Sequence, residues 1–279
     1  MKFTNSIKWN IAHHIKNNNL SKLQTYLESI VIKLEGTDNI RHTLKFIDFV
    51  KDYQSNSIKN NFNVFKIGNS KLPFLNFSTL PIITCEGSGD CEKYCYSLKA
   101  WRYPASFYLQ ARNTLLMDKF NIIEDQFNKV INLPKFRKLD KIDFRLYVDG
   151  DFKTLKDCLN WFNLMKVHPK VKFYGYSKSF GILNRLKNYD FPSNYKLNIS
   201  NGSKYDSNLE LLQVIQNLPI TRGKFTAVNI PKETKQIGKY MRNLLGEKII
   251  PCPTDCGTCS SIGHLCGSDI KTVIAIPIH

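Results

Sequence analysis

The fold of this chain is decided by the stretch IDFRLYVDGDFKTLKDCLNWFNLMKVHPKVKFYGYS, residues 142–177. Two β-type runs, at 142–148 and 171–177, flank an amphipathic helical run at 153–167. A strand, a helix and a second strand in this order are typical of a βαβ unit, in which the two strands are parallel. The stretch therefore predicts an α/β protein built on a parallel sheet.

The same alternation continues on both sides of this unit. Further strands are expected at 75–84, 195–200, 225–230, 247–250 and 272–278, and further helices at 105–132, 180–189, 207–218 and 232–245. Successive strands joined by helices suit right-handed crossovers. We expect a (β/α) repeat that forms a partial or full barrel, with an open doubly wound sheet as the alternative.

The first part of the chain has a different pattern. Residues 1–62 read as short amphipathic helices, with apolar positions such as Ile7, Ile11 and Ile15 at steps of four. We predict an N-terminal helical segment over 1–62 that packs as an appendage. An α/β metal-binding domain is predicted over 63–279, with a cysteine-rich loop at 250–269.

Composition narrows the setting. The 279 residues include 42% hydrophobic ones, enough for a substantial core, and no apolar run reaches the roughly 20 residues that span a bilayer. We expect a cytosolic protein without a membrane partner. A net charge of +17 favours nucleic acid as a partner, although the many Lys, Asn and Ile residues also fit an AT-rich genome. Motifs of P-loop, zincin and serine-hydrolase enzymes are absent from the sequence.

Eight cysteines are the most informative residues, because a reducing cytosol does not preserve disulfides. Cys85, Cys91 and Cys95 lie within eleven residues, with glycines between them that let the backbone curve inward. Three local ligands leave two alternatives: a fourth ligand from elsewhere, such as His264 or Cys158, or a cluster with one iron open to a small molecule. Cys158 has helical spacing with apolar neighbours and is otherwise expected in the core.

The second cysteine group is denser. Cys252, Cys256 and Cys259 form CxxxCxxC, and Cys266 follows in a glycine-rich segment. Four thiolates with one long and one short gap suit a [4Fe-4S] cluster, and zinc is the alternative. His264 is expected as a neighbour that donates to the centre and not as a ligand. Whether the two groups form one centre or two is left open.

Other candidates follow the predicted strands, where the ligands of parallel sheets collect. Asp149 and Asp151 are placed for acid and base chemistry, although either could cap the next helix. Ser177 and Lys178 end the next strand, and Lys178 could meet a phosphate or a carboxylate. Arg102, with Trp101 beside it, could bind a nucleic-acid substrate by charge and stacking, or both could anchor the following helix.

With these residues in hand, the chain from about Phe65 onward resembles the phage and plasmid family known as gene product 88. The matching stretches are CEGSGDCEKYCYSLKAWRY (85–103), FRLYVDGDF (144–152), FYGYSKS (173–179) and CPTDCGTCSSIGHLCGSD (252–269). That family is named for a phage gene and not for an activity. The resemblance therefore implies a mobile element in the cytoplasm of a host cell, and no particular reaction.

A more distant resemblance is to the radical S-adenosylmethionine enzymes. Their plan has a cysteine loop after the first strand of a partial barrel and an aromatic residue before the last cysteine, here Tyr94. The resemblance implies S-adenosylmethionine as a cofactor, with Tyr94 and Ser177 near it. The spacing departs from that family, which has CxxxCxxC in the first loop where this chain has CxxxxxCxxxC.

Two hypotheses follow. The first is an iron-sulfur enzyme with one or two [4Fe-4S] clusters, similar to radical S-adenosylmethionine enzymes, that acts on nucleic acid or a nucleotide-derived substrate. The second is a nucleic-acid-binding protein without catalytic activity, stabilised by zinc or by a cluster. The substrate and the oligomeric state are not indicated by the sequence.

Overall fold

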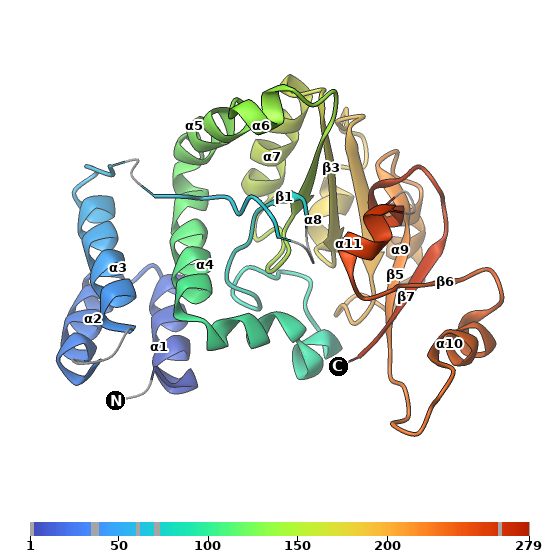
Figure 1. Cartoon of the computed structure of the whole chain (residues 1–279), viewed down its shortest axis with the longest axis horizontal. Coiled ribbons are helices and arrows are strands. Elements are labelled where there is room, and N and C mark those ends of the chain that lie inside the picture. Colours follow the sequence, from blue (N-terminus) through green and yellow to red (C-terminus); the bar gives the residue numbers. More distant parts are fainter. Residues whose placement is uncertain (1–2, 35–38, 60–61, 70–72, 262–263, 279) are drawn as a thin grey trace.

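The computed structural model describes residues 3–34, 39–59, 62–69, 73–261 and 264–278. Its centre is a sheet of seven strands in the order β1-β2-β3-β4-β5-β7-β6, and neighbouring strands are parallel (Figure 1). The strands are β1 (Leu75–Asn76), β2 (Ile142–Leu146), β3 (Val171–Ser177), β4 (Tyr195–Ser200), β5 (Thr221–Val228), β6 (Ile250–Pro251) and β7 (Val273–Pro277). The predicted α/β class is confirmed. Strands β1 and β6 form the two edges, and within the described ranges no pairing between them closes the sheet.

Helices precede the sheet and connect its strands. The α-helices are α1 (Asn5–Lys16), α2 (Leu20–Leu34), α3 (Asn39–Gln54), α4 (Pro104–Leu116), α5 (Phe120–Ile131), α6 (Pro134–Arg137), α7 (Leu155–Val167), α8 (Phe180–Arg185), α9 (Leu209–Gln216), α10 (Ile237–Leu245) and α11 (Cys256–Ser261). Short 3₁₀ helices are η1 (Asp90–Tyr94), η2 (Tyr96–Arg102), η3 (Met117–Lys119) and η4 (Leu265–Gly267). None of the helices in the described ranges is long and apolar enough to cross a membrane.

Several predicted elements have other bounds in the structure, such as β5, which begins at Thr221 and not at 225, and two predicted runs are broken. The strand expected at 75–84 is assigned only over Leu75–Asn76, although Thr79 N–H still donates to the carbonyl of Asp149 at 3.0 Å. Beyond it the left-handed backbone of Ile82 (φ 68°) turns the chain, and Thr84 N–H donates to the carbonyl of Leu80 at 3.2 Å. The helix expected at 105–132 is interrupted by η3 between α4 and α5. Local β propensity and a continuous apolar pattern concealed both breaks.

One face of the sheet carries the main core. Side chains alternate along each strand, and Phe144 of β2 and Phe173 of β3 are direct cross-strand partners, so both point to the same face. Phe127 of α5 stacks on Phe173 with ring centroids 5.8 Å apart, and Trp161 of α7 lies 6.0 Å from Phe144. Because β1 to β5 are adjacent in chain order, right-handed crossovers put their connecting helices on this single face.

The last two strands reverse the order in which strands are added across the sheet. Strand β6 lies two positions beyond β5, and β7 returns to the place between them. A right-handed connection that runs backwards crosses the opposite face of the sheet. The segment from β6 to β7 does so, since Asn198 Nδ2 of β4 donates to the carbonyl of Cys266 at 3.0 Å, and the orange-red segment with α11 lies against the strands in Figure 1. The C-terminal cysteines therefore lie on what we call the second face of the sheet.

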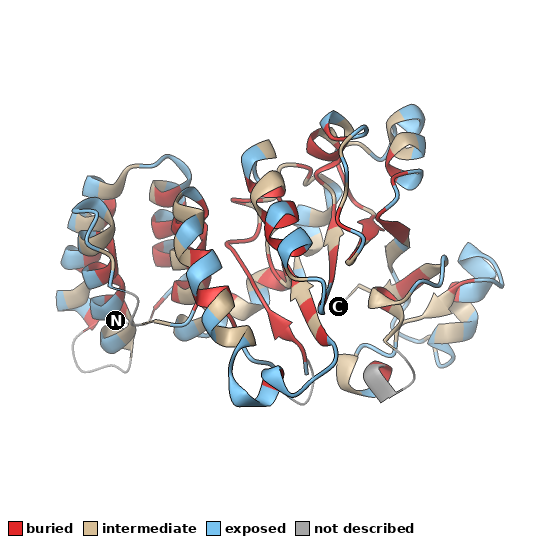
Figure 2. Cartoon of the chain, turned by 90° about the horizontal axis from the view of Figure 1, so that it is seen from above, coloured by how far each residue is buried: buried red, intermediate tan, exposed pale blue. Residues whose placement is uncertain are grey.

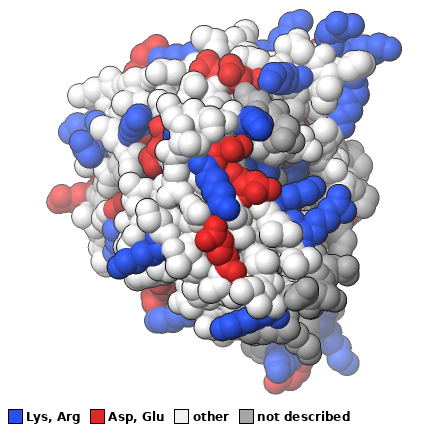
Figure 3. Space-filling view, turned by 90° about the vertical axis from the view of Figure 1, so that its left-hand side faces the viewer, with Lys and Arg blue, Asp and Glu red and all other residues white. Residues whose placement is uncertain are grey.

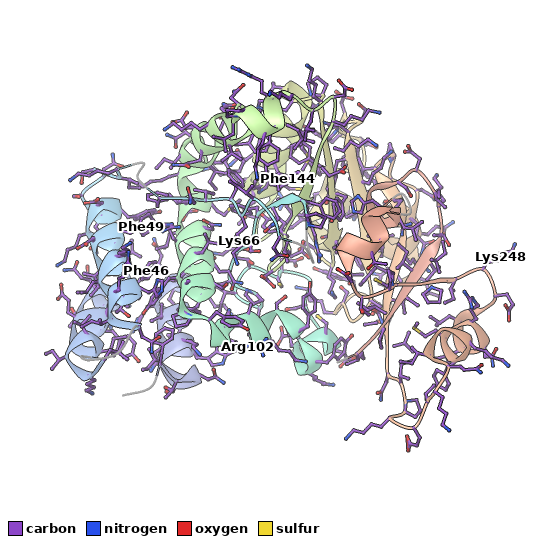
Figure 4. All side chains as sticks on the ribbon, viewed as in Figure 1. Phe46, Phe49, Lys66, Arg102, Phe144 and Lys248 are labelled. Atoms are coloured by element: carbon purple, nitrogen blue, oxygen red, sulfur yellow. The ribbon has the colours of Figure 1, made fainter. Side chains whose placement is uncertain are left out.

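The N-terminal helices pack on α4 at one end of the molecule (Figures 1 and 4). Phe46 of α3 lies 5.0 Å from Tyr108 of α4, and Thr43 Oγ1 and Tyr108 OH share a hydrogen bond of 2.8 Å. Their buried sides face the rest of the chain in Figure 2. Figure 3, which looks at this end, shows basic and acidic side chains interspersed, so the visible surface here carries no continuous basic patch.

Candidate metal centres on the sheet

The first cysteine loop lies across the carboxyl ends of β3 and β4. Cys91 N–H donates to the carbonyl of Gly202 at 3.1 Å, and the carbonyl of Gly87 accepts from Ser203 Oγ at 2.9 Å and from Lys204 N–H at 3.1 Å. A Cβ at Gly87 would lie 1.6 Å from the carbonyl oxygen of Lys178, so glycine is required for this approach. The loop is thus held where ligands of parallel sheets collect.

The three thiols of this loop are close enough to influence one another. Burial raises the pKa of Cys85, with a contribution from the Asp151 charge, and the N–H of Ile82 opposes this by donating to its Sγ at 3.4 Å. Burial likewise raises the pKa of Cys95, and the neighbouring Cys91 adds to the shift. A bound metal cation would lower these pKa values again, because it stabilises the thiolate form that binds metals.

The second cysteine group gathers four thiols between β6 and β7. Cys252 N–H donates to the carbonyl of Ala275 at 2.7 Å, which places it directly beyond the end of β6. Burial raises the pKa of Cys252 to about 11, and Cys266, Cys256 and Cys259 all contribute to the shift. Cys259 and Cys266 are buried, and within the described residues none of the cysteines forms a disulfide.

Hydrogen-bond donors surround this second group. The Tyr176 hydroxyl interacts with the Cys266 thiol, and the Arg145 guanidinium interacts with the Cys256 thiol, each lowering the pKa of its cysteine against the larger effect of burial. Arg145 also lies over the Tyr176 ring at 4.9 Å from its centroid. These donors stand where they would stabilise negative sulfur, as donors around metal sites do.

Arg145 lies between the two cysteine groups. Its Nη2 donates at 3.3 Å to the hydroxyl of Tyr96, the neighbour of Cys95, while its charge also acts on Cys256. Nevertheless, among the residues that the structure describes, its buried Nε has no hydrogen-bond partner, and neither do Tyr174 OH and His264 Nε2 on the same face. Buried polar atoms without partners are rare and indicate a missing ligand or water. Orphaned donors beside free thiols fit a thiolate-bound centre at this place.

Single-ion geometry is not formed. Within the described residues, no three His, Cys, Asp or Glu side chains converge closely enough to hold one metal ion. A zinc ion with bonds of about 2.3 Å to sulfur draws its ligands into a tight tetrahedron.

His264 packs in this region instead of approaching the thiols as a ligand. Its ring stacks on Phe74 with centroids 4.2 Å apart and meets Tyr174 edge-on at 4.4 Å. Burial lowers its pKa to about 4, so the ring is neutral near pH 7. The neutral ring offers one donor and one acceptor nitrogen beside the cysteine segment.

The predicted acidic residues are buried at the carboxyl end of β2. Asp151 accepts from Phe152 N–H at 2.8 Å and from Lys178 N–H at 2.7 Å, which joins the loops after β2 and β3. Asp149 accepts from Gln110 Nε2 at 2.9 Å. Burial raises the pKa of both carboxyls. For Asp151 its hydrogen bonds and the charge of Lys178 oppose this rise, and for Asp149 the hydrogen bond from Ser97 and the charge of Arg145 oppose it. Their catalytic role stays a prediction.

The other predicted residues lie around the same edge. Lys178 Nζ donates to Ser200 Oγ at 2.8 Å, and the buried Ser177 Oγ accepts from Ser179 N–H at 3.0 Å. The Tyr94 hydroxyl packs over Gly202, where a Cβ would lie 2.4 Å from it. The structure brings these residues to the first cysteine loop, and their roles toward a cofactor remain predictions.

Trp101 and Arg102, although adjacent in sequence, lie in different environments. Trp101 is 2% exposed, and its Nε1 donates to Gln110 Oε1 at 2.9 Å. It therefore anchors α4, which is the packing alternative considered for this residue. Arg102 is exposed and lies 4.8 Å from the centroid of the Tyr103 ring; it is labelled in Figure 4.

Sequence reasoning missed Arg145, Tyr176 and Asn198. A signal existed, because alternation along FRLYV and FYGYS places Arg145, Tyr174 and Tyr176 on the face opposite Phe144 and Phe173. What this face meets depends on the return of β7, which the local pattern does not indicate.

Fold and site together define a parallel α/β protein with two groups of free cysteines on one sheet. The family model described as gene product 88 matches residues 49–268. The chain therefore belongs to the gene product 88 family. No curated protein and no solved structure matched the chain in the same comparisons.

Proposed function

We propose that this chain is an iron-sulfur protein, with an open cluster on Cys85, Cys91 and Cys95 and a closed one on Cys252, Cys256, Cys259 and Cys266. The supporting observation is the placement of seven free thiols in two groups on one sheet, with Arg145 between them. A phage or other mobile element in a host cytoplasm is the setting that the family resemblance favours.

Three thiolates leave one iron of a [4Fe-4S] cluster without a protein ligand. Such a cluster supplies one-electron chemistry to a molecule bound at that iron. We infer a partial-barrel enzyme similar to the radical S-adenosylmethionine enzymes, acting on nucleic acid or a nucleotide-derived substrate. Lys178 stands beside this loop as a cation for a carboxylate or phosphate, and the buried Asp149 and Asp151 hold the loop ends that frame it.

The test is the iron and sulfide content of protein purified without oxygen. We expect near-stoichiometric iron with a broad visible absorption band, and a partial loss of iron in each of the variants Cys91→Ala and Cys256→Ala. Cys158→Ala is the matched control, because Cys158 is a buried cysteine of α7 outside both groups, and it should keep all its iron. Reductive cleavage of S-adenosylmethionine would then be measured, and it should be lost in Cys91→Ala.

A second function is favoured by one observation. The C-terminal group offers four thiols, a complete closed ligand set that needs no substrate and suits zinc or a structural cluster. In that case the chain is a metal-stabilised nucleic-acid-binding protein without catalytic activity. Colourless protein that contains zinc and no iron would refute the iron-sulfur proposal and leave this one.

A further inference from the structure

The helical layer has a gap over the amino ends of β5, β6 and β7. Helix α9 precedes β5 and α10 follows it, but β7 lies between β5 and β6 and receives its own connection on the second face. A pocket of about 620 Å³ occupies this gap, between Gln216 at the end of α9 and Leu245 at the end of α10. It is a depression open to solvent, wide enough to receive part of a small molecule.

The lining of this pocket is strongly basic. Lys224, Lys248 and Lys271 are the lysines among the lining, and Glu247 is the one acidic residue there. The three lysines are exposed, and within the described residues none of them forms an ion pair. Figure 4 shows Lys248 extending away from the body of the protein. Cations without counterions make the pocket attractive to anions.

One wall of the pocket is fastened by hydrogen bonds, and the lining is partly apolar. The buried Arg222 donates through Nη1 to the carbonyl of Ile270 at 3.0 Å and through Nη2 to that of Thr272 at 3.3 Å, which fastens the segment before β7 to β5. Leu245, Ile249 and Val273 add apolar surface to the lining. Apolar walls with a cationic rim suit a molecule that has a flat apolar part and a phosphate.

We propose that this pocket binds the phosphate-bearing part of a nucleotide, either free or within a nucleic-acid strand. Lys224, Lys248 and Lys271 would contact phosphate oxygens, and the apolar wall would take the base or the sugar. The pocket lies at the amino ends of the strands, whereas the first cysteine loop lies at their carboxyl ends. The inference extends the proposed nucleic-acid or nucleotide substrate class by a docking site, and it needs neither cluster.

The test compares two variants of equal charge. In the first, Lys224, Lys248 and Lys271 are all replaced by Gln; in the control, the exposed Lys16, Lys22 and Lys45 of the N-terminal helices are replaced in the same way. Binding of labelled single-stranded and duplex DNA oligonucleotides is followed by fluorescence anisotropy across a range of salt concentrations. Both variants lose three charges, so the general field falls equally and only the local contacts differ.

We expect the pocket variant to bind at least about tenfold more weakly than the control. Its dependence of log K on log salt should be shallower by about 2, since each lost phosphate contact removes about 0.7 to 0.9 from the slope. Replacing Glu247 by Gln should tighten binding, because it removes the acidic residue from the lining. ATP as a competitor separates the sources: displacement at millimolar concentrations indicates a free nucleotide, and no displacement indicates a strand.

Equal affinity of the pocket variant and the control would overturn the proposal, as would the absence of any binding by the unmodified protein to oligonucleotide or ATP. Metal content is measured on the same samples. If the protein contains no iron but the pocket variant still binds more weakly than the control, the iron-sulfur proposal fails and the pocket proposal stands. If the protein contains iron but the two variants bind equally, only the pocket proposal fails.

Discussion

Replacing Gly87 by Ala tests how the first cysteine loop is held on the sheet. The new Cβ would lie 1.6 Å from the carbonyl oxygen of Lys178, where a contact of at least 3.0 Å is needed, and the obstacle is backbone that cannot rotate away. The loop must therefore lift from β3. Its two hydrogen bonds, from Ser203 Oγ at 2.9 Å and from Lys204 N–H at 3.1 Å to the Gly87 carbonyl, would break or lengthen.

The expected magnitude follows from these contacts. Two hydrogen bonds contribute about 1 kcal/mol each, and backbone strain adds to this, so the free energy of unfolding should fall by about 2 to 4 kcal/mol. For a protein of 279 residues, with an unfolding entropy of about 2.1 cal/mol/K per residue, this lowers Tm by about 3 to 7 °C. Thermal unfolding followed by circular dichroism measures it, and the iron content of the same variant should fall as it does in Cys91→Ala.

Gly238→Ala is the matched control. This glycine lies in α10, and its Cβ would meet the Pro251 side chain at an ordinary 3.5 Å. Alanine should stabilise the helix by up to about 1 kcal/mol, with iron content unchanged. If Gly87→Ala melted within 1 °C of the unmodified protein, or no lower than Gly238→Ala, the docking of the loop on β3 as described would be wrong.

Three further predictions address other parts of the chain. Replacing the buried Asn113 by Leu should lower the free energy of unfolding by about 2 to 4 kcal/mol in urea titrations, because its amide donates to two backbone carbonyls at 2.9 and 3.0 Å; an exposed control, Asn132→Ala, should change it by less than about 0.5 kcal/mol. Thr154→Ala removes the capping box of α7 and should cost about 0.5 to 2 kcal/mol, whereas Thr154→Ser should restore most of it; equal stability of the two variants would contradict the capping role. Arg145→Gln should lower the reduction potential of the C-terminal cluster in an EPR-monitored titration, since a cation beside the thiolates favours the electron-rich state; an unchanged potential would show that Arg145 does not act on that centre.

Much of the sheet could be predicted from the sequence. The period-2 runs at 142–148, 171–177 and 195–200 correspond to β2, β3 and β4, because a buried parallel strand needs apolar residues that local inspection detects. The strand assigned within the run at 75–84 ends at Asn76, although Phe77 and Thr79 still exchange backbone hydrogen bonds with residues 145–149, and the left-handed backbone of Ile82 then turns the chain. The position of β6 was shifted to Ile250–Pro251, because its pairing with β7, and not its own composition, defines it.

The candidate site could be predicted only in its local parts. Cysteine spacing marked both groups, and the rule of carboxyl ends placed the first loop beside Lys178 and Asp151. Arg145 was missed because a single arginine in a strand does not indicate a site until it is known which segment covers its face of the sheet. Trp101 was equally ambiguous, because its burial also depends on a residue distant in sequence, Trp9 of α1, whose ring centroid lies 4.8 Å from its own.

The sequence by itself determined the class of fold and the two sets of thiols, because strand alternation and cysteine spacing are local properties. Only the tertiary structure decided that β7 enters between β5 and β6, since strand order depends on pairing between distant segments. Because β7 is inserted, the connection from β6 to β7 runs back across the sheet. A right-handed connection in that direction crosses the second face, and it carries the C-terminal cysteines there. There they meet Arg145, and on the other side the same insertion leaves the basic pocket without a covering helix.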